Sequence, residues 1–122
     1  MGRYNPWKHI GETYPHVIVC TAYELEPGVR GLIKDNHIWI CRTLDRVARR
    51  CTLAHEIVHL ERGIVRHPSD SVQTQEEERI VDTIAAHRLI DKELLTELRA
   101  ASLPTADIAK ALDVTERVLK YV

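Results

Sequence analysis

Residues 52–63 read TLAHEIVHLERG and place two histidines, His55 and His59, inside an otherwise apolar stretch. In an α-helix, residues four apart lie one above the other on the same face, so the two imidazoles converge on one point. Glu56 is rotated from His55 by about 100° and lies beside that point. This H-E-x-x-H spacing predicts two ligands of one zinc ion together with a general base.

The next helical stretch, residues 75–90, reads QEEERIVDTIAAHRLI and supplies candidates for a third ligand. The helical neighbours of Glu78 form an apolar stripe on which Glu78 and Asp82 are the only acids. An acid on a core face needs a partner, and a zinc ion is such a partner for Glu78. Asp82 is placed to accept a hydrogen bond from the free ring nitrogen of a ligating histidine. Glu76 and Glu77 remain alternative ligands, although first-turn acids are typically solvated.

The composition indicates one compact domain without a strong preference for a charged partner. Among 122 residues, 18 acidic residues nearly balance 17 basic ones, which argues against attraction to nucleic acid or an anionic membrane. We expect a cytosolic protein, because the sequence shows neither a membrane-length apolar run nor a secretory signal. The odd set of Cys20, Cys41 and Cys51 favours reduced thiols. Cys51 lies four residues before His55 and is a weaker ligand candidate.

The order of the predicted elements is strands first and helices afterwards, which argues for an α+β fold. After a short helix at 6–14, residues 16–42 predict a sheet from the strands HVIVC, RGLIK and HIWICR. We expect this small three-stranded sheet to be antiparallel. The helices that follow are predicted at 43–63 (N-cap Thr43, stop Gly63), 74–90, 92–100, 105–112 and 115–121.

These residues resemble the ImmA/IrrE family of zinc metallo-endopeptidases, many of which are encoded by bacteriophages and mobile elements. The resemblance covers roughly residues 28–90 and rests on RRCTLAHEIVH (49–59), the strand pair before it, and EERIVDTIAAHRLI (77–90). Carried over residue by residue, it implies one zinc ion with the ligands His55, His59 and Glu78. It also implies that Glu56 is the base and that Asp82 stands at the family's Asn/Asp position. It also implies that the substrate is a helix-turn-helix repressor.

The predicted fold is therefore α+β, with a small antiparallel three-stranded sheet packed on a zincin-like active-site helix and a second helix. Short C-terminal helices follow. We expect a zinc metallopeptidase domain at 1–91 and a helical C-terminal extension at 92–122. The end of this extension, LPTADIAKALDVTERVLKYV, resembles the middle of a helix-turn-helix motif. Asp113, however, stands where that motif prefers glycine, and the usual supporting helix is missing.

The predicted chemistry is hydrolysis of a peptide bond by a zinc-activated water, with Glu56 taking the proton and returning it to the leaving amine. The strand HIWICR is a candidate edge to which an extended substrate could add. The sequence does not single out a donor for the oxyanion that forms during hydrolysis. Candidates for this donor are His37, His67, Tyr23 and Arg88.

We predict a zinc-dependent endopeptidase that cleaves a regulatory protein, with a helix-turn-helix repressor as the expected partner. Two alternatives remain: a non-catalytic zinc-containing regulator of the anti-repressor or antitoxin type, and a DNA-binding regulator that acts through its C-terminal helices. Glu56 favours the peptidase, since a structural zinc site needs no base. The near-zero net charge argues against DNA binding. No membrane partner is expected, and the oligomeric state stays open.

Overall fold

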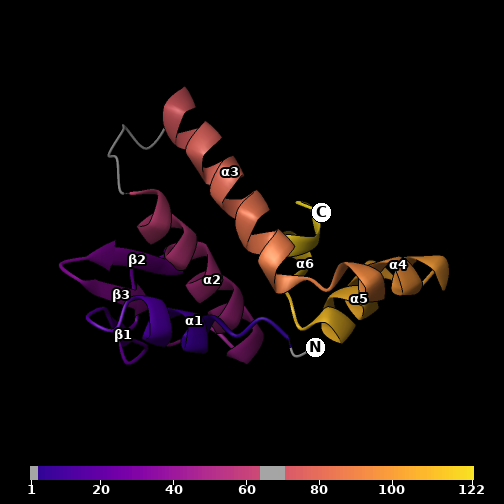
Figure 1. The fold of residues 1–122 in the computed structure, drawn as a ribbon, viewed down its shortest axis with the longest axis horizontal. Helices are drawn as coiled ribbons and strands as arrows, with labels where there is room; N and C mark the ends of the chain where they lie inside the picture. The colour runs from indigo at the N-terminus through magenta and orange to yellow at the C-terminus, as the bar shows by residue number, and fades with distance from the viewer. Residues whose placement is uncertain (1–2, 64–70) are drawn as a thin grey trace.

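The structure of the chain is a computed structural model that describes residues 3–63 and 71–122. In chain order, its elements are α1 (Pro6–Thr13), β1 (Ile18–Cys20), β2 (Gly31–Lys34), β3 (His37–Ile40), α2 (Arg46–Arg62), α3 (Val72–Leu89), α4 (Lys92–Ala100), α5 (Thr105–Leu112) and α6 (Glu116–Leu119). The sheet lies at one end of the molecule, α2 and α3 run side by side through the middle, and α4 and α5 lie at the other end (Figure 1). The α+β class is confirmed.

The sheet is mixed, so the prediction of an antiparallel sheet was wrong for β1. The strand order is β1-β3-β2, with β1 parallel to β3 and β2 antiparallel to β3. Asp35 and Asn36 both have positive φ, at 53° and 61°, and form the tight turn of the β2–β3 hairpin. The connection of residues 21–30 reverses the chain before β2, and β3 then inserts between β1 and β2. Because β2 runs opposite to β1 and β3 runs opposite to β2, β3 runs parallel to β1.

The strand order also corrects the predicted substrate edge. HIWICR contains β3, which pairs with a neighbour on both sides and has no free edge. Within the described residues, the outer edges of the sheet belong to β1 and β2.

Both long helices begin at side chains that cap their first turn. Asp45, not the predicted Thr43, caps α2, and its Oδ1 accepts a hydrogen bond from the Ala48 amide at 2.8 Å. Ser71 caps α3 through the Thr74 amide at 3.1 Å, so this helix begins before the predicted position. At the other end of α2, Gly63 adopts a φ of 83°, a conformation that glycine tolerates best.

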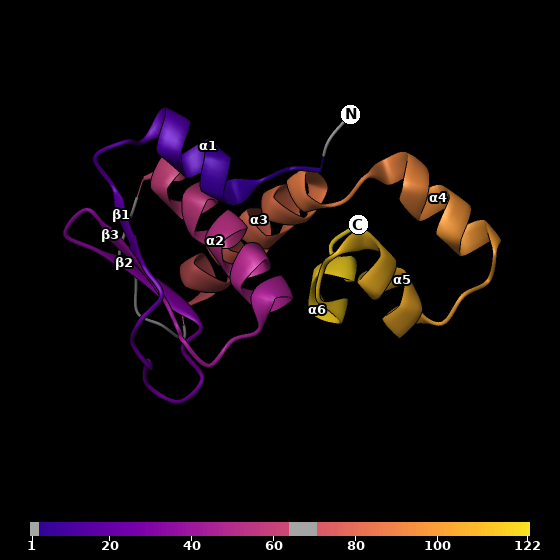
Figure 2. The same ribbon diagram turned by 90° about the horizontal axis from the view of Figure 1, so that it is seen from below.

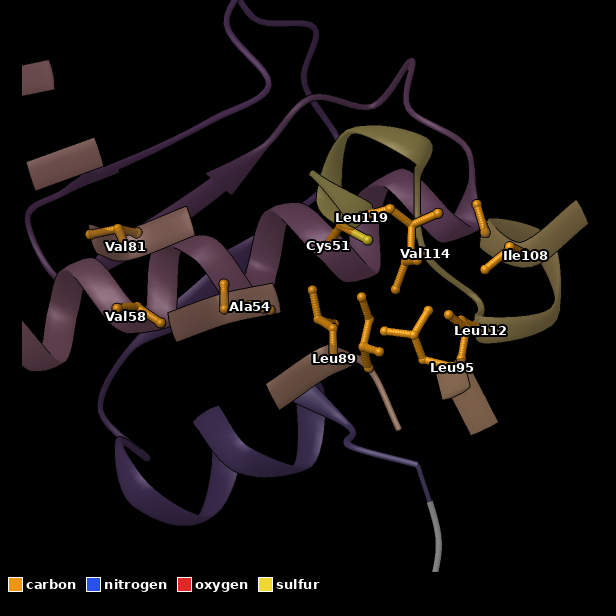
Figure 3. Close-up of a cluster of buried hydrophobic side chains, with 13 residues drawn as sticks. Cys51, Ala54, Val58, Val81, Leu89, Leu95, Ile108, Leu112, Val114 and Leu119 are labelled. Carbon is orange, nitrogen blue, oxygen red and sulfur yellow. The ribbon is translucent and has the colours of Figure 1, made fainter. Parts of the chain in front are cut away.

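Helix α2 is buried on two faces because it separates two apolar clusters. Leu53 and Ile57 pack with the sheet and with Ile10 of α1, and α1 lies alongside α2 (Figure 2). Ala54 and Val58 belong to the second cluster, which continues through α3 into the C-terminal helices (Figure 3). The face of α2 between these two clusters carries the histidines.

The second cluster joins residues from both sides of the predicted boundary at 91/92. Leu95 of α4, Ile108 of α5 and Leu119 of α6 are buried together with Leu89 of α3. The C-terminal helices therefore share one apolar cluster with α2 and α3, while the division into two domains stays a prediction. Among the described residues, no helix combines the length and the apolar character that crossing a membrane requires.

Candidate metal centre

Helices α2 and α3 bring three ligand side chains together. His59 Nε2 lies 2.9 Å from Glu78 Oε1, and His55 Nε2 lies 3.1 Å from Glu78 Oε2. The ligand atoms of these three residues all lie within 4.8 Å of one another. The arrangement follows from the four-residue spacing on α2 and from the packing of α3 against it. It is compatible with a metal site.

The alternative ligands from the sequence are engaged elsewhere. Glu77 accepts a bidentate contact from Arg62, with its Oε2 2.7 Å from Nε. Glu76 pairs with Arg79 at 2.9 Å. Cys51 is buried in the apolar cluster, and burial raises the pKa of its thiol.

The chemistry of the donor set fits a bound metal ion. His55 Nδ1 lies 2.8 Å from Asp82 Oδ1. An ionised carboxylate only accepts hydrogen bonds, so this contact assigns a proton to Nδ1, and the nitrogen that faces Glu78, Nε2, is the one that would bind a metal ion after losing its proton. Two imidazole nitrogens and one carboxylate form a donor set that catalytic zinc sites use.

Hydrogen bonds within the cluster shift the pKa values of His55 and Glu78. Burial disfavours a charged His55, but hydrogen bonds with Asp82 and Glu78 outweigh it and raise its pKa to about 9. Hydrogen bonds with His55 and His59 hold the pKa of Glu78 well below its usual range. A metal ion takes the neutral imidazole, so it competes with protons for the same ring nitrogen.

Glu56 lies beside this cluster and is only 7% exposed. Burial raises the pKa of its carboxyl group, against the opposing charges of the two histidines. A carboxylate with a raised pKa accepts a proton more readily than an exposed one does. The position and environment of Glu56 therefore suit a general base.

Asp82 links the cluster to the C-terminal end of the chain. Besides His55, it contacts Arg117, whose Nη2 lies 3.5 Å from its Oδ2, and the Tyr121 side chain, which hydrogen-bonds to it. Burial alone raises the pKa of Asp82, but the hydrogen bond and charge of His55, together with Arg117 and Tyr121, lower it. Asp82 therefore holds one predicted ligand in place and is itself held by residues that come 35 and 39 positions later.

The cluster faces a cavity of about 720 Å³. Its lining includes the predicted site residues, residues 28–31, which lead into β2, and Arg117 and Tyr121 from the C-terminal end. No sequence pattern predicts these last two, because their approach depends on how α4, α5 and α6 fold back onto α3.

The oxyanion donors proposed from the sequence lie elsewhere. His37 stacks on Trp39 at 5.4 Å between ring centroids, and Tyr23 packs on the same Trp39. Arg88 is paired with Glu61. None of these residues is among those that line the cavity. The remaining candidate, His67, lies outside the described residues.

Comparison with known proteins identifies the family. The family model of the IrrE N-terminal-like domain, Peptidase_M78, matches residues 22–122, from before β2 through the C-terminal helices. Searches of curated proteins and of solved structures gave no match. The histidine and glutamate cluster of α2 and α3 lies within the matched region. The chain therefore belongs to the Peptidase_M78 family of IrrE N-terminal-like domains, and its function is of the metallopeptidase type.

Proposed function

We propose that the protein is a zinc-dependent endopeptidase that hydrolyses a peptide bond in a regulatory protein. One observation carries the proposal: His55, His59 and Glu78 converge, with Glu56 buried beside them, on the wall of one cavity. A purely structural metal site needs no base. The buried position of Glu56 therefore favours catalysis over a non-catalytic regulator.

Each residue of the site has a separate role in the proposed hydrolysis. His55, His59 and Glu78 would hold the zinc ion, and Asp82 would orient His55 through its Nδ1 proton. A zinc ion bound by this set supplies Lewis acidity, which polarises a peptide carbonyl and makes water more acidic. Glu56 accepts a proton from the attacking water on its carboxylate and delivers it to the nitrogen of the leaving amine.

The edge of the sheet supports an endopeptidase. The outer edge of β2 is unpaired in the described part of the chain, and residues 28–31 line the cavity. An extended peptide that adds to β2 as a further strand would run past Glu56. Such a peptide can continue in both directions, which suits cleavage within a chain.

The choice of substrate rests on the family resemblance. The motifs around His55 and Glu78 resemble those of ImmA/IrrE peptidases, for which helix-turn-helix repressors are the expected targets. A repressor encoded beside this gene is therefore the first substrate to test.

The position of Arg117 supports the peptidase over a DNA-binding regulator. In a helix-turn-helix motif, Arg117 would belong to the recognition helix and face DNA. Here α6 is four residues long, and Arg117 lines the cavity and contacts Asp82.

The decisive variant is Glu56→Gln, which preserves the shape of the side chain but cannot take a proton. We expect it to bind zinc like the wild type and to cleave about 10²- to 10⁴-fold more slowly. The assay co-expresses each variant with the neighbouring repressor and follows the repressor by immunoblot and mass spectrometry. Glu12→Gln, at an exposed position of α1, is the matched control. Relief of repression by both forms while the repressor stays intact would replace the peptidase with a regulator that acts by binding.

A further inference from the structure

The C-terminal end of the chain adds a cationic side chain to the cavity. Arg117 and Tyr121 both line it, and both contact Asp82, the partner of His55. We propose that Arg117 is a substrate-contacting residue of this site: its guanidinium donates hydrogen bonds to the peptide oxygen that becomes negative during hydrolysis. This inference rests on the proposed peptidase function.

The anchoring of α6 explains how Arg117 is held there. Asp113, at the turn before α6, has a φ of 59° and accepts two hydrogen bonds from Arg46 of α2, at 2.6 and 2.9 Å. The buried Arg50 donates to the Asp113 carbonyl at 2.7 Å. Leu119 is buried in the apolar cluster (Figure 3). The backbone of α6 is therefore fixed to the same helix that carries both histidines.

The guanidinium of Arg117 has donors to spare. A guanidinium offers five N–H donors, and among the described residues the side chain of Arg117 makes one hydrogen bond, to Asp82, that is 3.5 Å long. Its side chain is 44% exposed, whereas that of Asp82 is 9% exposed. Arg117 can therefore keep Nη2 near Asp82 and present its other N–H groups to the cavity.

The other charged residues that line the cavity leave this role open. Glu56 and Glu78 are acidic and would repel a developing negative charge. Arg30 also lines the cavity and is exposed as Arg117 is, but its charge acts on Glu56, which carries the proton that moves, whereas Arg117 contacts Asp82, the partner of His55. Tyr121 hydrogen-bonds to Asp82 and acts as a positioning residue for the Asp82–Arg117 pair.

Charge balance is simple in the proposed step. When the water oxygen bonds to the carbonyl carbon, the π electrons of the carbonyl move onto its oxygen. Arg117 stabilises that charge by hydrogen bonding and keeps its own protons, while Glu56 carries the proton that moves. Charge-assisted hydrogen bonds from a guanidinium to an oxyanion are short and strong.

The test measures two affinities on the zinc-loaded full chain. The first is zinc affinity, by competition with a chelating dye. The second is the affinity for a phosphinic peptide, whose charged tetrahedral phosphinate imitates the transition state, selected on the wild type from a mixture of phosphinic tetrapeptides. The variants are Arg117→Gln and Arg117→Lys. Arg42→Gln is the control, because Arg42 is exposed, pairs with Glu24 and does not line the cavity.

We expect Arg117→Gln to weaken phosphinate binding about 10²- to 10³-fold, with zinc affinity changed less than tenfold, and Arg117→Lys to restore part of the loss. Unchanged phosphinate binding would overturn the assignment of Arg117 alone. A fall in zinc affinity as large as the fall in phosphinate affinity would also overturn it, since Arg117 would then act through Asp82. A wild type that binds zinc but no phosphinate would overturn the peptidase function and this assignment with it.

Discussion

Gly31 lies at a close approach between the sheet and α2, and adding one methyl group there tests the geometry around Glu56. A Cβ at Gly31 would lie 2.7 Å from Thr52 Cγ2, 3.1 Å from the Trp39 carbonyl oxygen and 3.2 Å from Glu56 Oε1. Carbon atoms at their optimal separation are about 3.5–4.0 Å apart. The Gly31→Ala substitution therefore forces β2 and α2 apart, or turns Thr52 and Glu56 from their positions.

The expected cost combines two opposing effects. Overpacking in a well-packed region costs about 1–3 kcal/mol. Replacing glycine by alanine stabilises the protein by about 0.4–1 kcal/mol, since alanine restricts the unfolded chain. This gain applies at Gly31 because its φ lies outside the left-handed region. From the midpoints of these two ranges, about 2 and about 0.7 kcal/mol, we expect the free energy of unfolding to fall by about 1.3 kcal/mol.

A double-mutant cycle isolates the contact with Thr52. Thr52→Ser removes the Cγ2 atom that the new methyl would meet, so the double variant should recover about 1 kcal/mol relative to additivity. Urea unfolding of the four proteins gives this coupling free energy. Gly11→Ala on α1, where a Cβ would meet nothing within 4 Å, is the control and should stabilise the protein. A Gly31→Ala variant as stable as the wild type, or strict additivity with Thr52→Ser, would refute this packing.

Two further variants test how Asp82 and Asp113 act. Asp82→Ala should weaken zinc binding about 10- to 100-fold in a chelator competition. Asp82→Asn should have a zinc affinity between those of Asp82→Ala and the wild type, because it keeps an oxygen acceptor for His55. Equal zinc affinity in the wild type and both variants would argue against this role of Asp82. Asp113→Asn should lower the free energy of unfolding by about 1–3 kcal/mol, since asparagine tolerates the positive φ but loses the ion pair with Arg46. That hydrogen bond lowers the pKa of Asp113, so its stabilisation is present above about pH 4 and is lost as the pH falls through the lowered value. Acid unfolding monitored by circular dichroism should therefore differ less between the wild type and Asp113→Asn as the pH falls, and a constant difference would contradict this linkage.

The convergence of the three candidate metal ligands was predictable because its geometry is mostly local. His55 and His59 converge through the helical repeat alone, and Glu78 was distinguished by its place on the apolar stripe of α3. The structure adds what the stripe could not show: Glu77 points to Arg62 and Glu76 to Arg79.

The sheet was predictable in its strands but not in their directions. The turn dipeptide at residues 35 and 36 predicts the β2–β3 hairpin, since asparagine and aspartate tolerate positive φ. The partner of β1 depends instead on the path of residues 21–30, and apolar alternation within a strand carries no information about that path. For this reason β3 was mistaken for an edge.

The C-terminal contacts were the least predictable part of the site. Asp113 looked like a defect in a helix-turn-helix motif, but it anchors the turn to Arg46 and Arg50 of α2. Arg117 and Tyr121 reach Asp82 only because the second apolar cluster folds α5 and α6 back onto α3. These contacts span 35 residues or more, so they depend on tertiary packing and leave no periodic signature.

The most direct test of the account is the zinc content and zinc affinity of the wild type, Glu78→Ala and Glu77→Ala. The two variants carry the same substitution at neighbouring positions, but only Glu78 contacts His55 and His59, while Glu77 pairs with the partly exposed Arg62. We predict one zinc ion per chain in the wild type and in Glu77→Ala, and loss of tight zinc binding in Glu78→Ala, by elemental analysis and chelator competition. A wild type that binds no zinc, or zinc that is lost in Glu77→Ala and kept in Glu78→Ala, would contradict the account.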